Sequence, residues 1–351
     1  MGIGEIDMDV SIVIPVKNGG KILGDVLQVI NAQKTNLKYE VICVDSGSSD
    51  DSVAVAKAAG CRVYEIPPTD FGHGKTRNLG ASYGAGEFIV FLTQDAIPVD
   101  ENWLDEFIKA MKEDDRIAAG FGKHLPYPDC NLPDQLMLKE HFLRFTAASN
   151  TPTDENGPVY RTPLMNTVFQ LTDEMKSTYE TDEGYRQFLA FFSDNCSCLR
   201  RSVWEQIPYD DVDYAEDQFW ARKILEAGYK KVFCPKAMVY HSHNYPLKSY
   251  AKRYFDDFKA IYRVYGSGAF ASDKRSMFRG TLGDMKHQCG YVYRYPGLSF
   301  GQKVKWMCYT CTRNLYRYRA MKRVLEYFEA NEEKQQEMDK KYSQQYQQIR
   351  S

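Results

Sequence analysis

Short apolar runs and helix-like segments alternate through the first 120 residues of the chain. The runs that are typical of strands lie at 11–16, 39–45, 61–66, 87–93 and 117–122. Helical spacing of apolar residues is found between them, near 22–30, 49–59, 74–84 and 101–112. Strands separated by helices of this length form βαβ units and a mostly parallel sheet. The sequence therefore predicts an α/β, Rossmann-like fold with helices on both faces of the sheet.

The pattern is less regular after residue 123. Stretches rich in Pro, Asn and Asp at 124–135 and 150–165 are expected to be loops. The run Phe188–Leu199 resembles a strand, and a helix near 215–227 precedes a strand at 231–240.

The last third of the chain is expected to be helical. It is rich in Tyr, Arg and Lys from about residue 246, and its Gln- and Glu-rich tail after 331 is expected to be a frayed or exposed helix. We divide the chain accordingly into a domain at 1–245, with halves at 9–123 and 124–245, and a helical region at 246–351.

Composition excludes several classes of protein. The chain has 351 residues, 43% of them apolar, so it can bury a core. A net charge of −2 gives no reason to expect nucleic acid as a partner. No apolar run reaches 18 residues, and the first nine residues lack the features of a signal peptide. Nine scattered cysteines favour reduced thiols, and we expect a cytoplasmic location.

Polar residues follow the strand-like runs, and ligands bind beyond the carboxyl ends of strands in open α/β sheets. Pro15 ends the first run, and backbone N–H groups near Asn18 could meet a nucleotide, although an ordinary turn is the alternative. Asp45 ends the second run and could accept hydrogen bonds from a base or a ribose. We assign the following Ser48, Ser49 and Asp50 to capping of the next helix.

The segment 72–78 combines flexible backbone with two cations. Arg77 offers planar donors for phosphate or a base carbonyl, and we favour it over Lys75 and over the alternative of a solvated basic turn. Glycines on both sides of His73 indicate that a large group approaches the backbone there.

Asp95 follows a wholly apolar run and could cap a helix or bind Mg²⁺ or Mn²⁺. Magnesium needs only one or two protein carboxylates when substrate phosphates complete its shell. His241 and His243 follow another apolar run, and we expect at most one of them to face the crevice. An imidazole beside Asp95 would complete a metal site.

Asp217 stands at the start of a predicted helix. Acids at this place can simply complement the helix dipole. The functional alternative is a general base for a sugar hydroxyl, whose proton would move late because an aspartic acid in water has a pKa of about 3.9.

These motifs together resemble family 2 glycosyltransferases of the GT-A fold, and among them bacterial rhamnosyltransferase-like enzymes. The resemblance covers about residues 9–245, and it is carried by Ile14-Pro15-Val16-Lys17-Asn18, Val44-Asp45-Ser46-Gly47-Ser48, Lys75-Thr76-Arg77-Asn78, Thr93-Gln94-Asp95-Ala96 and Glu216-Asp217.

The resemblance implies a role for each matching residue. It implies that Asp217 is the catalytic base. Asp95, with His241 or His243, would hold a divalent metal. The implied nucleotide-binding residues are Pro15, Val16, Asn18, Asp45, Lys75, Arg77 and Gln94.

The implied reaction is inverting transfer of a sugar from a dTDP- or UDP-type donor to a saccharide or lipid-linked saccharide in cell-surface polysaccharide synthesis. Motifs at 71–74 and 93–96 favour L-rhamnose from dTDP-L-rhamnose. Two positions depart from the family: Thr93 replaces the first acid of the metal motif, and Ser46 replaces a frequent second acid. We therefore expect modest metal affinity. A sugar-nucleotide-binding scaffold without turnover, or an NDP-sugar nucleotidyltransferase, is the alternative.

The segment 301–330 carries seven Lys or Arg against two Glu, with aromatic residues between them. Such a segment could pack on the catalytic domain or form a homodimer. It could equally attach the protein to the anionic inner face of the cell membrane.

Overall fold

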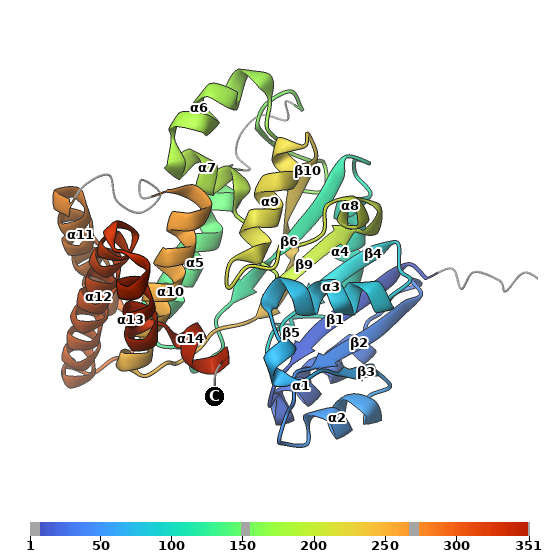
Figure 1. Cartoon of the computed structure of the whole chain (residues 1–351), viewed down its shortest axis with the longest axis horizontal. Helices are drawn as coiled ribbons and strands as arrows, with labels where there is room; N and C mark the ends of the chain where they lie inside the picture. Colours follow the sequence, from blue (N-terminus) through green and yellow to red (C-terminus); the bar gives the residue numbers. More distant parts are fainter. Residues whose placement is uncertain (1–7, 149–154, 267–273, 350–351) are drawn as a thin grey trace, which may run out of the picture. The chain divides into compact units, whose positions relative to one another are not determined.

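A computed structural model of the chain describes residues 8–148, 155–266 and 274–349 (Figure 1). These residues form two compact units. The first unit contains the chain up to Tyr127, His141–Lys176 and Leu189–His241. The second contains Pro128–Glu140, Ser177–Phe188 and the chain from Ser242 onward.

The first unit is built on a 10-stranded sheet. Its strands are β1 (Val10–Val16), β2 (Tyr39–Asp45), β3 (Arg62–Glu65), β4 (Phe88–Leu92), β5 (Ile97–Pro98), β6 (Ile117–Leu125), β7 (Val159–Arg161), β8 (Thr167–Phe169), β9 (Cys196–Arg200) and β10 (Lys230–Tyr240). The strand order is β3-β2-β1-β4-β9-β6-β10-β8-β7, with β5 paired to β10. Strands β3, β2, β1 and β4 are parallel, whereas β9 runs antiparallel to both β4 and β6.

Helices cover both faces of this sheet (Figure 1). Those of the first unit are α1 (Gly20–Asn31), α2 (Ser52–Ala58), α3 (His73–Tyr83), α4 (Trp103–Met111), α8 (Arg201–Gln206) and α9 (Glu216–Glu226). Helix α1 buries Leu23, Val26, Leu27 and Ile30, the i, i+3, i+4, i+7 pattern of an amphipathic helix. Each such side chain contributes roughly 1.5–3 kcal/mol by leaving water.

Alternation along β1 decides which helix packs on which face. Ile12 and Ile14 share a core with α1, α2 and α4. Val13 points the other way, because successive strand residues face opposite sides. There, a Cβ on Gly80 of α3 would lie 2.3 Å from Val13 Cγ1, so only glycine lets this helix lie so close to the sheet.

The second unit is helical. It contains α10 (Leu247–Tyr265), α11 (Lys274–Arg294), α12 (Phe300–Glu329), α13 (Glu332–Tyr342) and α14 (Gln344–Ile349). Tyr254, Phe255 and Val324 belong to its aromatic-rich core. Three helices, α5 (Leu132–Ala148), α6 (Lys176–Thr181) and α7 (Glu183–Ala190), each contain residues of both units. Among the described helices, none combines the length and apolarity needed to cross a membrane.

The tail after 331 is helical and largely exposed, as its composition indicated, but it is anchored rather than frayed. It forms α13 and α14, and both dock on the second unit. Met338 is buried, and Lys259 donates to Asp339 at 2.6 Å. Asp256 accepts the N–H groups of Gln344 and Gln345 at the start of α14. Polar contacts therefore anchor this segment together with the buried Met338.

The predicted α/β class and the five strands predicted in the first 122 residues are confirmed, but the sheet is mixed rather than mostly parallel. The difference arises in the run Phe188–Leu199. Its first residues end helix α7, and the strand begins only at Cys196. The loop expected at 124–135 gives way to α5 at Leu132, and the loop expected at 150–165 includes strand β7 from Val159. Residues 149–154 of that loop lie outside the described residues.

Candidate active site

Several elements of the first unit end or begin at one edge of the sheet. The parallel strands β1, β2 and β4 end there. Strand β9 is antiparallel to both β4 and β6, so β6 runs in the same direction as β4, and β10 is parallel to β6. Antiparallel β9 therefore starts at this edge, with Cys196 opposite Leu92. The segment Ser193–Asn195 thus reaches the region where ligands bind in α/β sheets.

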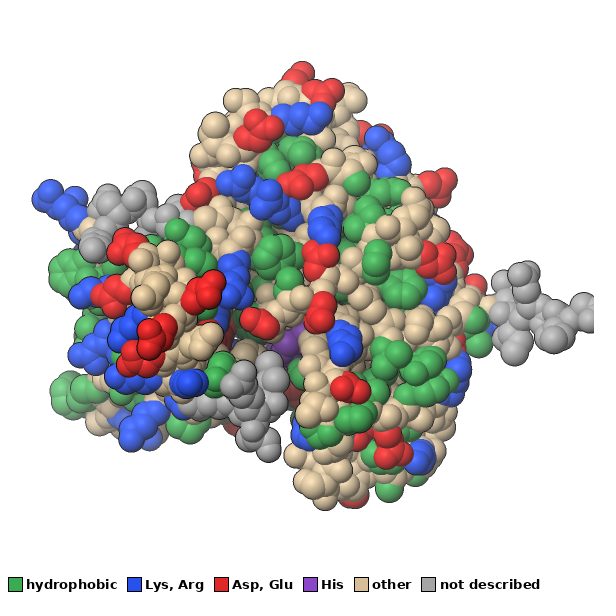
Figure 2. All heavy atoms as spheres, viewed as in Figure 1, with side chains coloured by type: hydrophobic (Ala, Val, Ile, Leu, Met, Phe, Trp, Pro, Cys, Tyr) green, Lys and Arg blue, Asp and Glu red, His purple; other side chains and the backbone are tan. Residues whose placement is uncertain are grey.

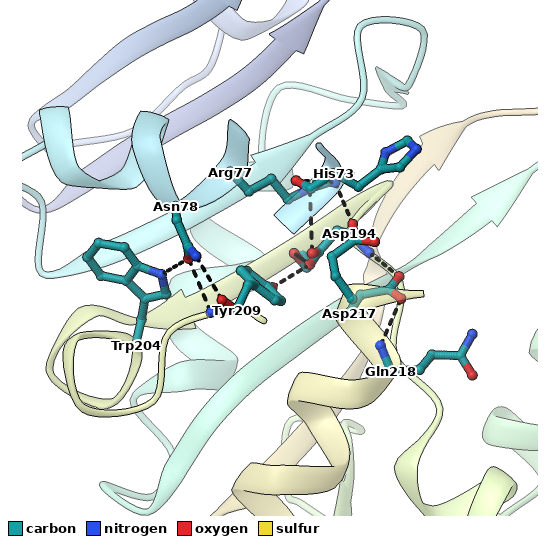
Figure 3. Close-up of polar contacts among 10 residues, drawn as sticks. His73, Arg77, Asn78, Asp194, Trp204, Tyr209, Asp217 and Gln218 are labelled. Carbon is teal, nitrogen blue, oxygen red and sulfur yellow. Dashed lines mark hydrogen bonds and ion pairs between the residues drawn. The ribbon is translucent and has the colours of Figure 1, made fainter. Parts of the chain in front are cut away.

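A buried cluster of charged side chains lies at this edge (Figure 3). The Arg77 guanidinium, only 5% exposed, lies with its Nη1 2.6 Å from Glu216 Oε1 and its Nε 3.5 Å from Asp194 Oδ2. Asp194 Oδ1 also accepts from the hydroxyl groups of Ser197, at 2.7 Å, and Tyr209, at 3.0 Å. Three elements distant in sequence, α3, the start of β9 and the start of α9, are joined by these contacts.

Asp217 is oriented by backbone donors on two sides. Its Oδ1 accepts the N–H of Gln218 at 2.8 Å, and its Oδ2 accepts the N–H of Asp194 at 3.2 Å (Figure 3). The preceding Ala215 has φ 63°, a left-handed conformation that costs a non-glycine residue about 1–2 kcal/mol. This turn places Glu216 and Asp217 in the first turn of α9, where the helix dipole favours negative charge.

The cluster carries more negative than positive charge, and this raises carboxyl pKa values. Burial is the largest cause that raises the pKa of Asp217 well above its usual 3.8. The carboxylates of Glu216 and Asp194 add to the rise, and Arg77 opposes it. Burial likewise raises the pKa of Asp194 to about 6, against the attraction of Arg77. Asp217 is therefore a stronger base than an aspartate in water.

Because Asp194 is buried, we expect the free energy of unfolding to depend on pH. Its pKa is higher in the folded chain than in the unfolded chain, so its protonation stabilises the fold. That contribution is complete below about pH 4 and is lost as the pH rises through about 6. The stability advantage of the wild type over Asp194→Asn should therefore grow from pH 7.5 to pH 5, by about 1 kcal/mol per pH unit near the low end.

Urea unfolding at the two pH values measures this difference. Asp115→Asn, which changes an exposed carboxylate, is the control and should show no such trend. An equal difference between wild type and Asp194→Asn at both pH values would contradict the assignment.

Asp95 and His241 form a second group at the same edge. His241 Nδ1 lies 3.4 Å from Asp95 Oδ1, and the His241 side chain is 10% exposed. The His124 ring lies on another side of His241, with ring centroids 5.5 Å apart. Of the two predicted histidines, His241 is the one beside Asp95 within the first unit. His243 belongs to the second unit, and its role as a ligand stays a prediction.

The predicted nucleotide residue Asp45 is buried and holds its own loop. Its carboxylate accepts the N–H groups of Gly47 and Ser48 at 2.9 Å each, and the Ser48 hydroxyl as well. Ser48 therefore bonds Asp45 rather than capping the next helix. Asp50 does bond at that helix start, through the N–H of Ser52 at 3.1 Å.

The loop after β1 is tied to its neighbours in the same way. Gln94 accepts the N–H of Lys17 and donates to its carbonyl, both at 2.9 Å. The N–H of Asn18 donates to Ser48 Oγ at 2.8 Å. Pro15 lies at the end of β1, and the Val16 side chain is packed in the core, so only its backbone could meet a ligand. Nucleotide binding by these residues stays a prediction.

The structure changes the interpretation of the 72–78 segment. A Cβ on Gly74 would lie 2.5 Å from the carbonyl oxygen of Asp210, so the group that approaches this glycine closely is the chain's own 209–216 segment. Arg77 is engaged by carboxylates of the protein, whereas Lys75 is exposed. Both remain predicted nucleotide-binding residues.

Asp194 is the residue of this site that the sequence reasoning missed. Functional acids are expected after parallel strands, whereas Asp194 precedes a strand. The signal in the sequence was an isolated acid, flanked by Ser193 and Asn195, between the apolar runs at 188–192 and 196–199. An antiparallel strand delivers its first residues, rather than its last, to the edge where parallel strands end.

Comparisons with known proteins identify the family of the chain. A family model described as Glycosyl transferase family 2 matches residues 11–207. The O-antigen chain rhamnosyltransferase RfbN of Salmonella typhimurium is 31% identical over 253 residues, 71% of each chain. The O-antigen chain rhamnosyltransferase WbaN of Salmonella anatum is 31% identical over 250 residues, 70% of each chain.

A solved structure shares the fold. The mannosyltransferase PcManGT from Pyrobaculum calidifontis, in complex with GDP-Man and Mn²⁺, superposes with a TM-score of 0.53 at 15% identity. The match covers 91% of this chain and 87% of that one. The chain therefore belongs to glycosyl transferase family 2 and is a glycosyltransferase with the GT-A fold.

Proposed function

We propose that this glycosyltransferase moves L-rhamnose from dTDP-L-rhamnose to a saccharide or lipid-linked saccharide during synthesis of a cell-surface polysaccharide. The observation that carries the proposal is the 31% identity to two O-antigen rhamnosyltransferases over about 70% of the chain. The charged cluster of Arg77, Asp194, Glu216 and Asp217 supplies the chemistry that such a reaction needs.

In this proposal Asp217 is the general base. It accepts the proton of the acceptor hydroxyl as the oxygen attacks the anomeric carbon, and the bond to the nucleoside diphosphate breaks on the opposite face. The configuration at the anomeric carbon is thereby inverted. Two backbone N–H groups hold the Asp217 carboxylate in place, which reduces the entropic cost of positioning it.

The raised pKa of Asp217 suits this role. A general base is most effective when its pKa lies near the working pH, because it is then both ionised and strongly basic. Burial and the neighbouring carboxylates shift Asp217 in that direction from 3.8. Proton transfer can therefore begin earlier along the reaction than it could with an aspartate in water.

Asp95 and His241 fit a divalent metal. One carboxylate oxygen and one imidazole nitrogen, 3.4 Å apart, are ligands that Mn²⁺ accepts, and Mg²⁺ accepts the carboxylate. The hydroxyl oxygen of Thr93, two residues before Asp95, is buried and has no hydrogen-bond partner among the described residues. A bound metal would stabilise negative charge on the leaving diphosphate. We propose His243 as a further ligand.

Replacing Asp95 by Asn should weaken Mn²⁺ binding by about tenfold or more, because an amide oxygen lacks the charge of a carboxylate. Titration calorimetry with Mn²⁺ and dTDP measures this binding, and the metal dependence of turnover provides a second measurement. Asp100→Asn, at an exposed acid five residues further on, should leave both unchanged. Unaltered Mn²⁺ affinity in Asp95→Asn would remove Asp95 from the metal site.

The donor is tested with a panel of nucleotide sugars. The assay measures release of free nucleoside diphosphate in the presence of a rhamnose-containing oligosaccharide, and NMR gives the configuration of the product. We expect dTDP-L-rhamnose to be turned over fastest, to a product of inverted configuration. Faster turnover of another donor would refute the rhamnosyl assignment, and a complete lack of release would indicate a binding scaffold.

We propose residues 1–245 as the catalytic domain and 246–351 as a region for attachment to a membrane surface or to a second subunit. The main segment of the second unit begins at Ser242, close to this division, which supports it.

A further inference from the structure

The seam between α11 and α12 is unusually polar. Buried Gln288 accepts a hydrogen bond from the buried Asn314 amide at 2.8 Å. Arg317 forms an ion pair with Asp284 across the same seam. Thr281 is buried in α11 as well. The apolar residues of an ordinary amphipathic helix pair would occupy these inward positions.

Large apolar residues are found on the outside of these helices, in addition to buried ones such as Met277 and Val292. Helix α11 exposes 50% of Phe278, 48% of Leu282 and 65% of Tyr293, and helix α12 exposes 83% of Phe300, 42% of Val304 and 47% of Leu315. Exposed apolar side chains gathered in this way indicate a surface that is covered in the functional state.

The two sets form one continuous surface. Both have the same spacing, i, i+4, i+15, which keeps three residues on one side of an α-helix of 3.6 residues per turn. Cys289 lies eleven residues after Phe278, and Cys311 eleven after Phe300, so each lies on the stripe of its own helix. Their sulfur atoms are 3.8 Å apart, which places the stripes side by side. We call this surface, formed by the six apolar residues, the α11–α12 face.

Basic residues flank the α11–α12 face. Residues 274–329 contain twelve Lys or Arg and three Asp or Glu. Several of the basic side chains are exposed near the stripes, namely Arg275, Arg279, Lys286, Lys305, Arg319 and Lys322. Figure 2 shows hydrophobic and basic side chains intermixed over the part of the view that α11 and α12 occupy.

We propose that the α11–α12 face binds the anionic surface of a lipid bilayer. Its aromatic and aliphatic side chains enter the boundary between headgroups and acyl chains, and the basic side chains meet lipid phosphates. A second copy of the chain is the less suitable occupant, because a twofold interface would bring two basic surfaces together. The proposal rests on the proposed function, since a lipid-linked acceptor lies at such a surface.

Vesicle co-sedimentation of the full chain tests the proposal. We expect binding to vesicles of phosphatidylcholine and phosphatidylglycerol in a 7:3 ratio, weaker binding to phosphatidylcholine alone, and release as NaCl is raised to about 0.5 M. The triple variant Leu282→Ser, Tyr293→Ser, Phe300→Ser should bind about tenfold more weakly or worse.

A control changes three exposed apolar residues of the first unit: Leu143→Ser, Leu164→Ser and Met165→Ser. This control should bind vesicles as the wild type does. Equal loss of binding in both triple variants, or no wild-type binding to anionic vesicles, would overturn the proposal. So would a dimer in sedimentation velocity that only the α11–α12 variant disrupts.

Transfer to a water-soluble acceptor without vesicles separates this proposal from the proposed function. The α11–α12 variant should keep wild-type turnover in that assay. Vesicle binding without any turnover of dTDP-L-rhamnose would sink the donor assignment alone, whereas turnover without vesicle binding would sink the membrane assignment alone.

Discussion

Asp217→Asn is expected to lower the rate of sugar transfer by about 10³-fold while leaving donor binding nearly unchanged. Asn is close in shape and its single amide oxygen can still accept one of the two N–H groups, that of Gln218 or that of Asp194, but it cannot take up the proton of the acceptor hydroxyl. Steady-state kinetics with a soluble acceptor and calorimetry with dTDP separate the two effects. A kcat within about tenfold of the wild type would exclude Asp217 as the base.

Asp211→Asn is a suitable control for this experiment. Asp211 is an exposed acid in the segment that leads to α9, and its replacement should change kcat little. The pH profile gives a second test. Because the pKa of Asp217 lies well above 3.8, wild-type activity should fall with decreasing pH sooner than ionisation of an ordinary aspartate would allow.

Arg77→Met is expected to have the largest effect on stability, a loss of about 3–5 kcal/mol in the free energy of unfolding. The substitution removes the cation that lies between Glu216 and Asp194 and leaves these buried carboxylates, with Asp217 beside them, without compensation. The loss should shrink as the pH falls from 7.5 toward 5, because the carboxylates can then be neutralised by protonation.

Arg62→Met is the matched control for Arg77→Met. Arg62 is also paired with a carboxylate, that of Glu40, but its side chain is 49% exposed. Surface pairs of this kind contribute about 0–1 kcal/mol. Urea unfolding of the two variants compares the pairs directly. Equal losses would contradict the conclusion that Arg77 neutralises a buried cluster.

The first half of the sheet could be predicted from the sequence because strands β1, β2 and β4 each contain a continuous apolar run of four residues or more. Phe88–Leu92 is buried along its whole length, and a short, continuous apolar run of this kind is typical of a buried strand. The mixed half could not be predicted in this way. Strand β9 includes Cys196 and Ser197, and its direction depends on pairing with β4 and β6, which no local pattern reports.

The candidate site was predictable where a single side chain follows a parallel strand. We expect one of His241 and His243 to lie beside Asp95, and His241, 146 positions further along the chain, does so. Contacts between loops could not be predicted from the sequence in this way. The glycine at 74 pointed to a close approach, but the approaching group is backbone at Asp210. The partners of Arg77 come from α9 and from the segment just before β9, and only the folded sheet brings them together.

A crystal structure of the chain with Mn²⁺ and dTDP-L-rhamnose, using the Asp217→Asn variant to slow turnover, tests the central claim most directly. The account predicts an anomalous Mn²⁺ peak bonded to the Asp95 carboxylate and the His241 imidazole. It also predicts a diphosphate on that metal and a sugar whose anomeric carbon faces residue 217. Metal and nucleotide bound away from Asp95, or a sugar that turns its anomeric carbon from residue 217, would contradict it.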